Sequence, residues 1–573
     1  MSPRTPLSLG LAGALLFLAA PAAGQVALPG AAQIPQAQQR FKRPTPPQSA
    51  QPSETPAPPD IQAPPPGAET VRFVLRTVDF EGMTRYTPAD LAPLYAGLVG
   101  REVSLADLYR LAAQVTDRYR RDGYMLSVAI VPRQDIEAGA VRIQVVQGFV
   151  SKTRFNGPLD GPGTLPENLA ARITTSRPLR TADLERDVLL IGDLPGVNVQ
   201  SVLSPSLDAF GGADLELVVQ QTPWEGFVSL DNQGSRYLGP YALSAGWSEY
   251  SRFGGYEQID LTGAIDPFDN TMAYVQGAVT VPVHHAGRLM GDTLQLSGLY
   301  SRAKPDLPDE VFPFQTRSEN VEGRLTYFVP VIRGRQRNLS ARLAFIWRDL
   351  ENRITDLPTD PFNPQEEHVR VLQPRLTYDG VDRFRAVSIL DLTANIGLGV
   401  FGASRNADPR LVRYNADGQF FYLAGMAAHL QPVADRASIL ARVDFQVSDQ
   451  PLPTTERFGV GGPRAGTGYP PGAITGDSGL SLRLEGRYGR ELSSRTITGY
   501  QAYLHYDYGF ASDQTPGPDD WNALSTIGLG VRLNLFKALA FNPEITHQLS
   551  GSPADCSDCR HETRLLFSLT QRF

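Results

Sequence analysis

The last residues of the chain form an amphipathic strand that ends on Phe573. Every second residue from Leu565 to Phe573 is apolar except Gln571, and the residues between them are mostly polar. A period of two is typical of a β-strand with one face in apolar surroundings and the other in water. Such a strand can close a barrel or lie at the edge of a soluble sheet, and the rest of the chain distinguishes the two.

The beginning of the chain carries an export signal. Arg4 precedes an apolar stretch, and Ala22-Ala23-Gly24 offers small residues for cleavage, so residues 1–24 are predicted to be a secretory signal peptide. After residue 24 the sequence contains no run of about 18 apolar residues, the length that a membrane-spanning helix requires. An exported chain without such a helix can still be integral to a membrane as a closed barrel. The aromatic end also resembles the terminal signal of bacterial outer-membrane barrels.

Composition argues against several classes of partner. The net charge is −7, whereas a nucleic-acid partner would require a basic face. The few lysines lie outside any glycine-rich phosphate loop, so no nucleotide is expected. We find no paired-carboxylate or metal-ligand cluster, and we expect no cofactor, no metal and no enzymatic activity.

Residues 25–69 are predicted to be a polar amino-terminus and a proline-rich linker. Proline is frequent from Pro44 to Pro66, and such a segment adopts extended polyproline II rather than packing a core. At ~3.1 Å per residue it would reach about 70 Å, more than the ~40–45 Å of a whole bilayer. The proline-rich segment could be a functional tether or a disordered leader without a role, and the sequence does not distinguish the two.

Residues 70–149 read as a small α+β module. Val71 to Phe80 is predicted to be a strand, and a first helix follows Thr87-Pro88. Ser104 caps a stronger helix with one apolar stripe, which Gly123 ends. Two further strands are predicted over residues 125–132 and 140–147.

Residues 150–223 repeat this β-α-α-β-β order. We expect a strand to Phe155, helices around residues 169–173 and 181–191, and then two strands. Two copies of one module in tandem are an internal repeat of fold, although sequence identity between them is weak.

From residue 224 the pattern of apolar and polar residues changes, and the helical periodicity disappears. Alternating segments are separated by Gly, Pro, Asp and Asn, and Tyr and Phe recur near their ends. At roughly 22 residues per strand and connection, residues 224–573 would give about 16 strands, an even number as in bacterial barrels. We therefore predict an all-β transmembrane barrel of antiparallel strands preceded by two α+β modules. Two stacked soluble β-domains are the alternative.

Several stretches carry a family resemblance when they are taken together. They are Leu184-Glu185-Arg186 with Asp193-Leu194-Pro195-Gly196-Val197, Leu230-Asp231-Asn232-Gln233-Gly234-Ser235, Phe458-Gly459-Val460-Gly461-Gly462, Gly476-Asp477-Ser478-Gly479 and Tyr506-Asp507-Tyr508-Gly509. With two modules before a barrel, the chain resembles the two-partner secretion transporters (TpsB type, hemolysin secretion/activation family). The resemblance implies POTRA domains in the periplasm, a barrel in the outer-membrane lipid, and a long loop folded back into the barrel.

The resemblance also implies a lock between that loop and the barrel wall. Its expected residues are Arg464, Thr467, Gly468, Tyr469, Asp507 and Gly509. The family usually has Val-Arg-Gly-Tyr/Phe at the tip of the loop, whose Arg pairs with the wall Asp, but Thr467 stands at the Arg position here. Arg464 could supply the guanidinium to Asp507, or could be a solvated loop residue.

Relatives of this kind often begin with a helix threaded through the pore. Pro29 and Pro35 leave about two turns between Gln36 and Lys42, fewer than the ~12 residues that a lone helix needs. A full plug helix is therefore not expected.

Two other chemical readings receive little support from the sequence. Gly476-Asp477-Ser478-Gly479 also spells the nucleophile loop of trypsin-like proteases, but no histidine lies in a matching context. His284 and His285 are adjacent, so on a strand their rings would point to opposite faces and could not readily share a metal.

Cys556 and Cys559 are the only cysteines, and polar neighbours place them in a loop. In a cytosolic protein this spacing could be redox-active or half of a zinc site, whereas in an exported chain a small disulfide is favoured. We predict that thiol labelling without reductant fails, and that removing both cysteines barely affects export. A large loss of export would instead indicate a working redox or metal pair.

The sequence thus favours a passive outer-membrane pore that recognises one large secreted protein through its POTRA domains and exports it unfolded. The main alternative is an assembly factor that inserts other barrels with a related architecture. A plain diffusion porin would not need the modules. The identity of the secreted partner is open.

Overall fold

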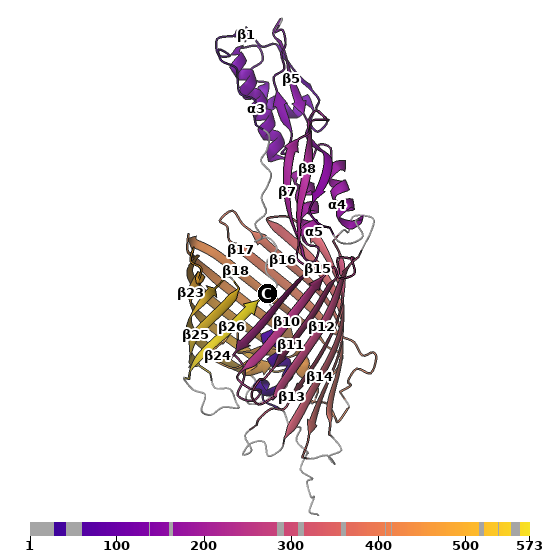
Figure 1. Cartoon of the computed structure of the whole chain (residues 1–573), viewed down its shortest axis with the longest axis vertical. Coiled ribbons are helices and arrows are strands. Elements are labelled where there is room, and N and C mark those ends of the chain that lie inside the picture. The colour runs from indigo at the N-terminus through magenta and orange to yellow at the C-terminus, as the bar shows by residue number, and fades with distance from the viewer. Residues whose placement is uncertain are drawn as a thin grey trace, which may run out of the picture.

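The computed structural model describes residues 28–41, 60–136, 138–159, 164–283, 291–307, 315–356, 363–406, 408–413, 415–514, 521–536, 538–551 and 562–573. Over these ranges, two small α+β modules stand in line above a closed β-barrel (Figure 1). Several sequence predictions lie outside the described residues, namely the signal peptide, most of the proline-rich linker, His284, His285, Cys556 and Cys559.

The first module is built on a three-stranded sheet. Its elements are β1 (Arg72–Val74), β2 (Thr77–Glu81), α2 (Pro88–Tyr95), β3 (Glu102–Ser104), α3 (Leu105–Arg121), β4 (Val128–Ile130) and β5 (Ala140–Val146). The sheet has the order β2-β5-β4, with β2 parallel and β4 antiparallel to β5. β1 pairs with β3 in a separate two-stranded sheet.

The single strand predicted over residues 71–80 is wrong, because the chain changes partner in its middle. The Leu75 amide donates to the Arg101 carbonyl at 3.0 Å, and the Arg76 amide donates to the Gly139 carbonyl at 2.8 Å. The two halves therefore join different sheets, and the fully buried side chain of Leu75 anchors the bend in the core.

Helix α3 forms as its sequence predicts. The Ser104 hydroxyl accepts a hydrogen bond from the Asp107 amide at 3.2 Å, and the Asp107 carboxylate accepts from the Ser104 amide at 2.7 Å. This capping box satisfies two amides that the first turn leaves free. The apolar stripe, with Leu108 and Val115 at its centre, is fully buried against the sheet.

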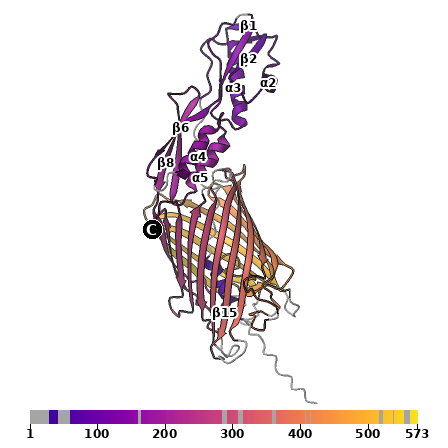
Figure 2. The same ribbon diagram turned by 90° about the vertical axis from the view of Figure 1, so that its right-hand side faces the viewer.

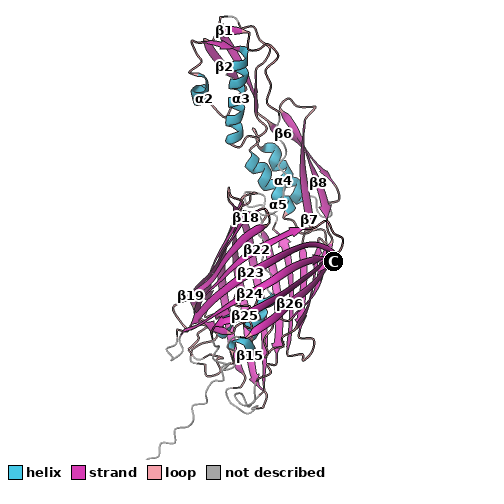
Figure 3. Ribbon diagram, turned by 90° about the vertical axis from the view of Figure 1, so that its left-hand side faces the viewer, coloured by secondary structure: helices cyan, strands magenta, loops and turns pink. Residues whose placement is uncertain are grey.

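The second module repeats this topology. Its elements are β6 (Phe149–Asn156), α4 (Thr164–Thr175), α5 (Thr181–Gly192), β7 (Val197–Pro205) and β8 (Gly212–Gln221). The sheet has the order β6-β8-β7, with β6 parallel and β7 antiparallel to β8. Figure 3 shows the helices of this module on one side of its sheet.

The modules and the barrel are joined by buried contacts. Leu126 of the first module packs into the apolar core of the second, which also receives Tyr256 from the barrel. Arg333, in the turn after β14, donates two hydrogen bonds of 2.7 Å to the carboxylate of Asp193 at the end of α5. Arg333 is nearly fully buried, so this bidentate pair fixes the second module on the rim of the barrel.

Sixteen strands of the described residues close the barrel, each antiparallel to its neighbours. They are β9 (Trp224–Asp231), β10 (Ala242–Tyr250), β11 (Gln258–Ile265), β12 (Met272–Pro282), β13 (Thr293–Ala303), β14 (Thr316–Ile332), β15 (Arg337–Ile354), β16 (Gln365–Val381), β17 (Val387–Gly397), β18 (Phe421–Ala434), β19 (Ala437–Ser448), β22 (Ser478–Glu491), β23 (Ile497–Ser512), β24 (Trp521–Leu535), β25 (Leu539–Ser550) and β26 (Thr563–Arg572). The predicted barrel and its strand number are confirmed.

The terminal strand closes the ring by pairing with β9. The Phe573 amide donates to the Gly226 carbonyl at 2.9 Å, which extends the ladder to the last residue. On the outer face Leu565 is 73%, Leu569 37% and Phe573 64% exposed. Large apolar side chains that stay exposed on a closed barrel are what a lipid-facing band requires.

Within the described ranges, no helix combines the length and the apolar character that a membrane crossing would need. The same ranges contain no group of three His, Cys, Asp or Glu residues placed to hold a metal ion.

Candidate functional site in the barrel lumen

Two segments that are far apart in the sequence fill the interior of the barrel. One is residues 28–41, here called the lumen segment, whose short helices lie inside the ring of strands (Figure 2). The other is the inward loop, residues 449–477 between β19 and β22, which contains the hairpin β20 (Phe458–Val460) and β21 (Ile474–Gly476). The interior of the barrel is therefore the candidate functional site.

The lumen segment is helical, but only in short pieces. They are η1 (Gly30–Ala32), α1 (Ile34–Gln38) and η2 (Gln39–Phe41). This agrees with the prolines that argued against a full plug helix. The apolar side of the segment packs on the barrel wall, where Ile34 and Ala37 form a buried cluster with Leu238, Met272 and Ala303.

Polar side chains hold the lumen segment to the wall and to the inward loop. Arg40 pairs with Asp231 at the end of β9, and the side-chain amide of Gln38 donates through Nε2 to the Ser301 hydroxyl at 2.5 Å. The side-chain amide of Gln36 donates through Nε2 to the Arg457 carbonyl of the inward loop at 3.3 Å. These are hydrogen bonds and one ion pair, so the segment can leave without breaking a covalent bond.

The tip of the inward loop binds Asp507 on β23. The Oδ2 atom of Asp507 accepts hydrogen bonds from the amides of Gly466 at 2.8 Å and Thr467 at 3.3 Å. Asp507 is fully buried, so its charge needs a cation close by.

That cation is Arg483 on β22, not Arg464. Arg483 Nε lies 2.8 Å from Asp507 Oδ1, Nη2 lies 3.1 Å from Oδ2, and Nη1 donates to the Pro463 carbonyl at 3.0 Å. In the described part of the chain, Arg464 is exposed and forms no hydrogen bond or ion pair with Asp507. Of the two alternatives for Arg464, the structure has the exposed loop residue, and Arg483 pairs with Asp507 because it stands directly opposite in the β22–β23 register.

The neighbours of Asp507 complete a polar layer. His505 Nε2 lies 3.1 Å from Glu544 Oε1, and Thr467 Oγ1 lies 3.4 Å from the same ring nitrogen. Thr467 therefore touches the wall through a hydroxyl and its backbone amide. The loop contributes no charge to this lock.

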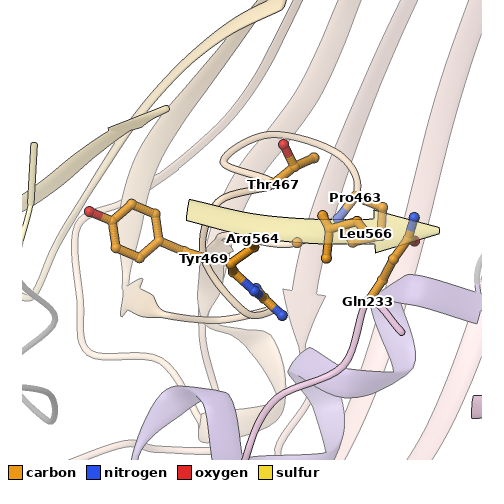
Figure 4. A pocket seen from close by; sticks show the side chains of 7 residues that line it. Gln233, Pro463, Thr467, Tyr469, Arg564 and Leu566 are labelled. Carbon is orange, nitrogen blue, oxygen red and sulfur yellow. The ribbon is translucent and has the colours of Figure 1, made fainter. Parts of the chain in front are cut away.

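The remaining predicted residues of the lock also lie at this contact. Gln548 donates to the Gly468 carbonyl at 2.9 Å, and the Tyr469 hydroxyl donates to the Gly551 carbonyl at 2.9 Å. Figure 4 shows Thr467 and Tyr469 beside a small pocket between the loop and β26. The pocket is lined by Gln233, Gly462, Pro463, Thr467, Tyr469, Arg564 and Leu566.

Two glycines allow the close approach of loop and wall. A Cβ atom on Gly509 would lie 2.4 Å from Val460 Cγ1 of the hairpin, so any side chain there would push the hairpin away. Gly466 has a φ of +83°, which turns its amide toward Asp507 and which other residues rarely adopt.

A second anchor lies where the loop returns to the wall. Asp477 is fully buried and accepts hydrogen bonds from Arg413 and from the Leu452 amide, the latter at 2.8 Å. The Ser478 hydroxyl donates to the Ser448 carbonyl at 3.1 Å and accepts from its amide at 2.9 Å. The Gly-Asp-Ser-Gly sequence therefore serves the loop, and Ser478 is engaged with backbone rather than with a histidine.

Sequence reasoning missed Arg483, His505, Glu544 and the role of Asn232. Asn232 uses its amide side chain as a strand would, accepting from the Phe567 amide at 2.7 Å and donating to the Leu565 carbonyl at 2.8 Å. It thereby extends the β9–β26 seam. Alternation along β22 could have indicated that Arg483 lies on the wet face of its strand, but no local signal gives its partner across the sheet.

Comparison with known proteins identifies the family. Residues 73–148 match the POTRA domain of ShlB type, and residues 211–533, more than half of the chain, match the haemolysin secretion/activation protein ShlB/FhaC/HecB family. The chain belongs to this family. It is an outer-membrane translocation pore that works with a secreted partner protein, with its POTRA modules in the periplasm.

Individual members of the ShlB/FhaC/HecB family are distant relatives. The heme/hemopexin transporter protein HuxB of Haemophilus influenzae is 24% identical over 481 residues, 81% of each chain. The outer membrane transporter CdiB of Dickeya dadantii (strain 3937) is 22% identical over 426 residues, 72% of each chain. The solved structure of CdiB from Escherichia coli has a TM-score of 0.72 and 20% identity, and covers 96% of this chain and 100% of its own.

Proposed function

We propose that this transporter exports one large secreted protein in extended form, with first contact at a free sheet edge of the second module. We also treat residues 70–149 and 150–223 as POTRA 1 and POTRA 2, with the barrel from residue 224. The repeated topology of the two modules supports this division. The observation that carries the proposal is the free edge of β7.

In the described part of the chain β7 pairs with β8 alone, so its other edge is open. At the two ends of the ladder the Ser206 amide donates to the Gly212 carbonyl at 2.9 Å and the Thr222 amide to the Gly196 carbonyl at 2.8 Å. Bonded and non-bonded pairs alternate in an antiparallel ladder. The amides and carbonyls of Val199, Ser201 and Leu203 must therefore point away from β8.

An extended polypeptide can use such an edge as an additional strand. Main-chain hydrogen bonds supply the affinity and tolerate many sequences. The hairpin tip that follows β7 adds apolar surface, since Leu207 is 99% and Phe210 77% exposed. The bound chain would then pass into a barrel whose contents are held by non-covalent contacts.

The alternative function is assembly of other barrels in the outer membrane. The family match favours secretion. We further propose that the pore performs no reaction of its own, contacts outer-membrane lipid through its apolar band, and requires neither nucleic acid nor nucleotide. By its chemistry the secreted partner is an extended polypeptide.

Deleting residues 71–220 is expected to abolish export while the barrel still reaches the outer membrane. The barrel is closed and offers no sheet edge, so an incoming strand would have no place to pair. Export is measured as partner protein at the cell surface, and barrel insertion by protease protection in intact cells. Undiminished export by this variant would contradict the proposal.

A single substitution tests the edge itself within the same prediction. Ser201→Pro removes an outward amide without removing a β8 bond, because proline lacks the N–H group and is tolerated on edge strands. Export should fall several-fold. Ser201→Ala keeps the backbone amide and is the matched control. Val202→Pro removes a hydrogen bond of the β7–β8 ladder, and its increased proteolysis serves as the reference for a misfolded module. Equal export by Ser201→Pro and Ser201→Ala would assign recognition to another surface.

A further inference from the structure

We propose that four arginines lining the lumen, three on the barrel wall and one in the inward loop, bind carboxylate groups of the polypeptide in transit. The arginine patch consists of Arg342 on β15, Arg375 on β16, Arg442 on β19 and Arg464 in the inward loop. The inference rests on the proposed export of an extended chain, and names the side chains that such a chain would present here.

The patch faces the lumen close to the module end of the barrel. Arg442 stands directly opposite Arg483 in the register, and Arg483 reaches the inward loop, so both share the inner face. Leu343 and Leu376, next to Arg342 and Arg375, are 49% and 51% exposed on the outer face. Because side chains alternate along a strand, Arg342 and Arg375 must point inward.

The pairing of these strands places like charges opposite each other. Arg342 is the direct partner of Arg375, and Arg442 of Arg483. Like charges directly opposite in a sheet are destabilising. A wall shaped by stability alone would alternate the signs, so the arrangement indicates a function that needs excess positive charge.

Only part of this charge is neutralised within the protein. Arg375 pairs with Asp391 at 2.7 Å and Arg442 with Asp444 at 2.7 Å. Within the described residues, Arg342 and Arg464 form no ion pair, and Arg464 lies within electrostatic range of Asp444, Arg442 and Arg375. Four cations and two carboxylates leave a net charge of 4 − 2 = +2.

Carboxylate is the ligand that fits this geometry. A guanidinium donates two parallel hydrogen bonds to one carboxylate, and a wall of one sign concentrates ions of the opposite sign. The Arg375 side chain is 42% exposed and Arg464 is exposed, so an entering chain can reach them. Glutamate and aspartate side chains of the exported protein would be drawn in from the periplasm.

Fluorescence anisotropy of a labelled ten-glutamate peptide tests the patch on the full chain in detergent at low salt. The peptide should bind, and Arg342→Gln with Arg464→Gln should weaken binding at least about tenfold through loss of two charge-assisted contacts. Arg383→Gln with Arg385→Gln, in the exposed turn after β16, removes the same charge at the same end of the barrel. This control pair should bind as the parent does, and a ten-lysine peptide should not bind.

Unchanged binding in the patch variant, or an equal loss in the control pair, would overturn the inference. Displacement by inorganic phosphate at equal anion concentration would also overturn it, because the site would then take small anions rather than polypeptide carboxylates. Arg464→Gln alone should weaken binding in part, which keeps the test valid if the double variant does not fold. The Ser201→Pro variant should still bind the peptide, so failure of edge recognition and failure of the patch are distinguishable.

Discussion

Arg483→Leu is expected to release the inward loop and to reduce export to a small fraction of the parent level. Arg483 is the one guanidinium bonded to the fully buried carboxylate of Asp507 among the described residues. Leaving a buried charge without its partner costs roughly 3–5 kcal/mol. The melting temperature of the purified protein should fall, and protease should cut the loop. Arg464→Gln, which leaves Asp507 untouched, should change neither the melting temperature nor the resistance of the loop to protease.

Two combined variants separate charge pairing from packing. Arg483→Leu with Asp507→Leu should be less destabilised than Arg483→Leu alone, because no unpaired charge remains. Thr467→Arg in the Arg483→Leu background should recover stability and export, since it returns a guanidinium to the position that the family usually uses. Additive defects, or no recovery with Thr467→Arg, would show that the loop is held mainly by Gly466, Thr467 and Tyr469 backbone and hydroxyl contacts.

Replacing the lumen segment by a glycine-serine sequence of equal length is expected to open the barrel. The segment buries Ile34 and Ala37 on the wall and pairs Arg40 with Asp231, and a glycine-serine chain can make neither contact and stays flexible. Conductance in planar bilayers should rise several-fold, and cells should admit large antibiotics that the outer membrane excludes.

A smaller change provides the graded test of the same contact. Arg40→Ala removes the ion pair with Asp231 and the guanidinium over the Phe41 ring, and should give an intermediate conductance. Arg110→Ala, on the exposed side of α3, should leave conductance unchanged. Parent-level conductance after replacement of the whole segment would mean that the inward loop alone closes the barrel.

Local pattern was enough to predict the fold class. The alternation near Phe573 and through residues 224–573 is typical of strands with one apolar and one wet face, and the number of strands follows from the spacing of turn residues. Helix α3 was equally readable, because Ser104, Asp107 and the apolar stripe act within one helix. The family motifs placed Asp507, Gly509, Thr467 and Tyr469 at one contact, where the structure also has them.

The tertiary structure alone decided which charged groups meet. Asp507 pairs with Arg483 because the register of β22 and β23 sets them opposite each other. Arg464, the candidate in the inward loop, is exposed and forms no ion pair with Asp507 in the described part of the chain. The division of residues 71–80 between two sheets likewise depends on Arg101 and Gly139. Periodicity is a local property that each segment carries in its own sequence. Register and partner choice depend on how distant segments close into one ring, and the sequence of a single strand does not contain that information.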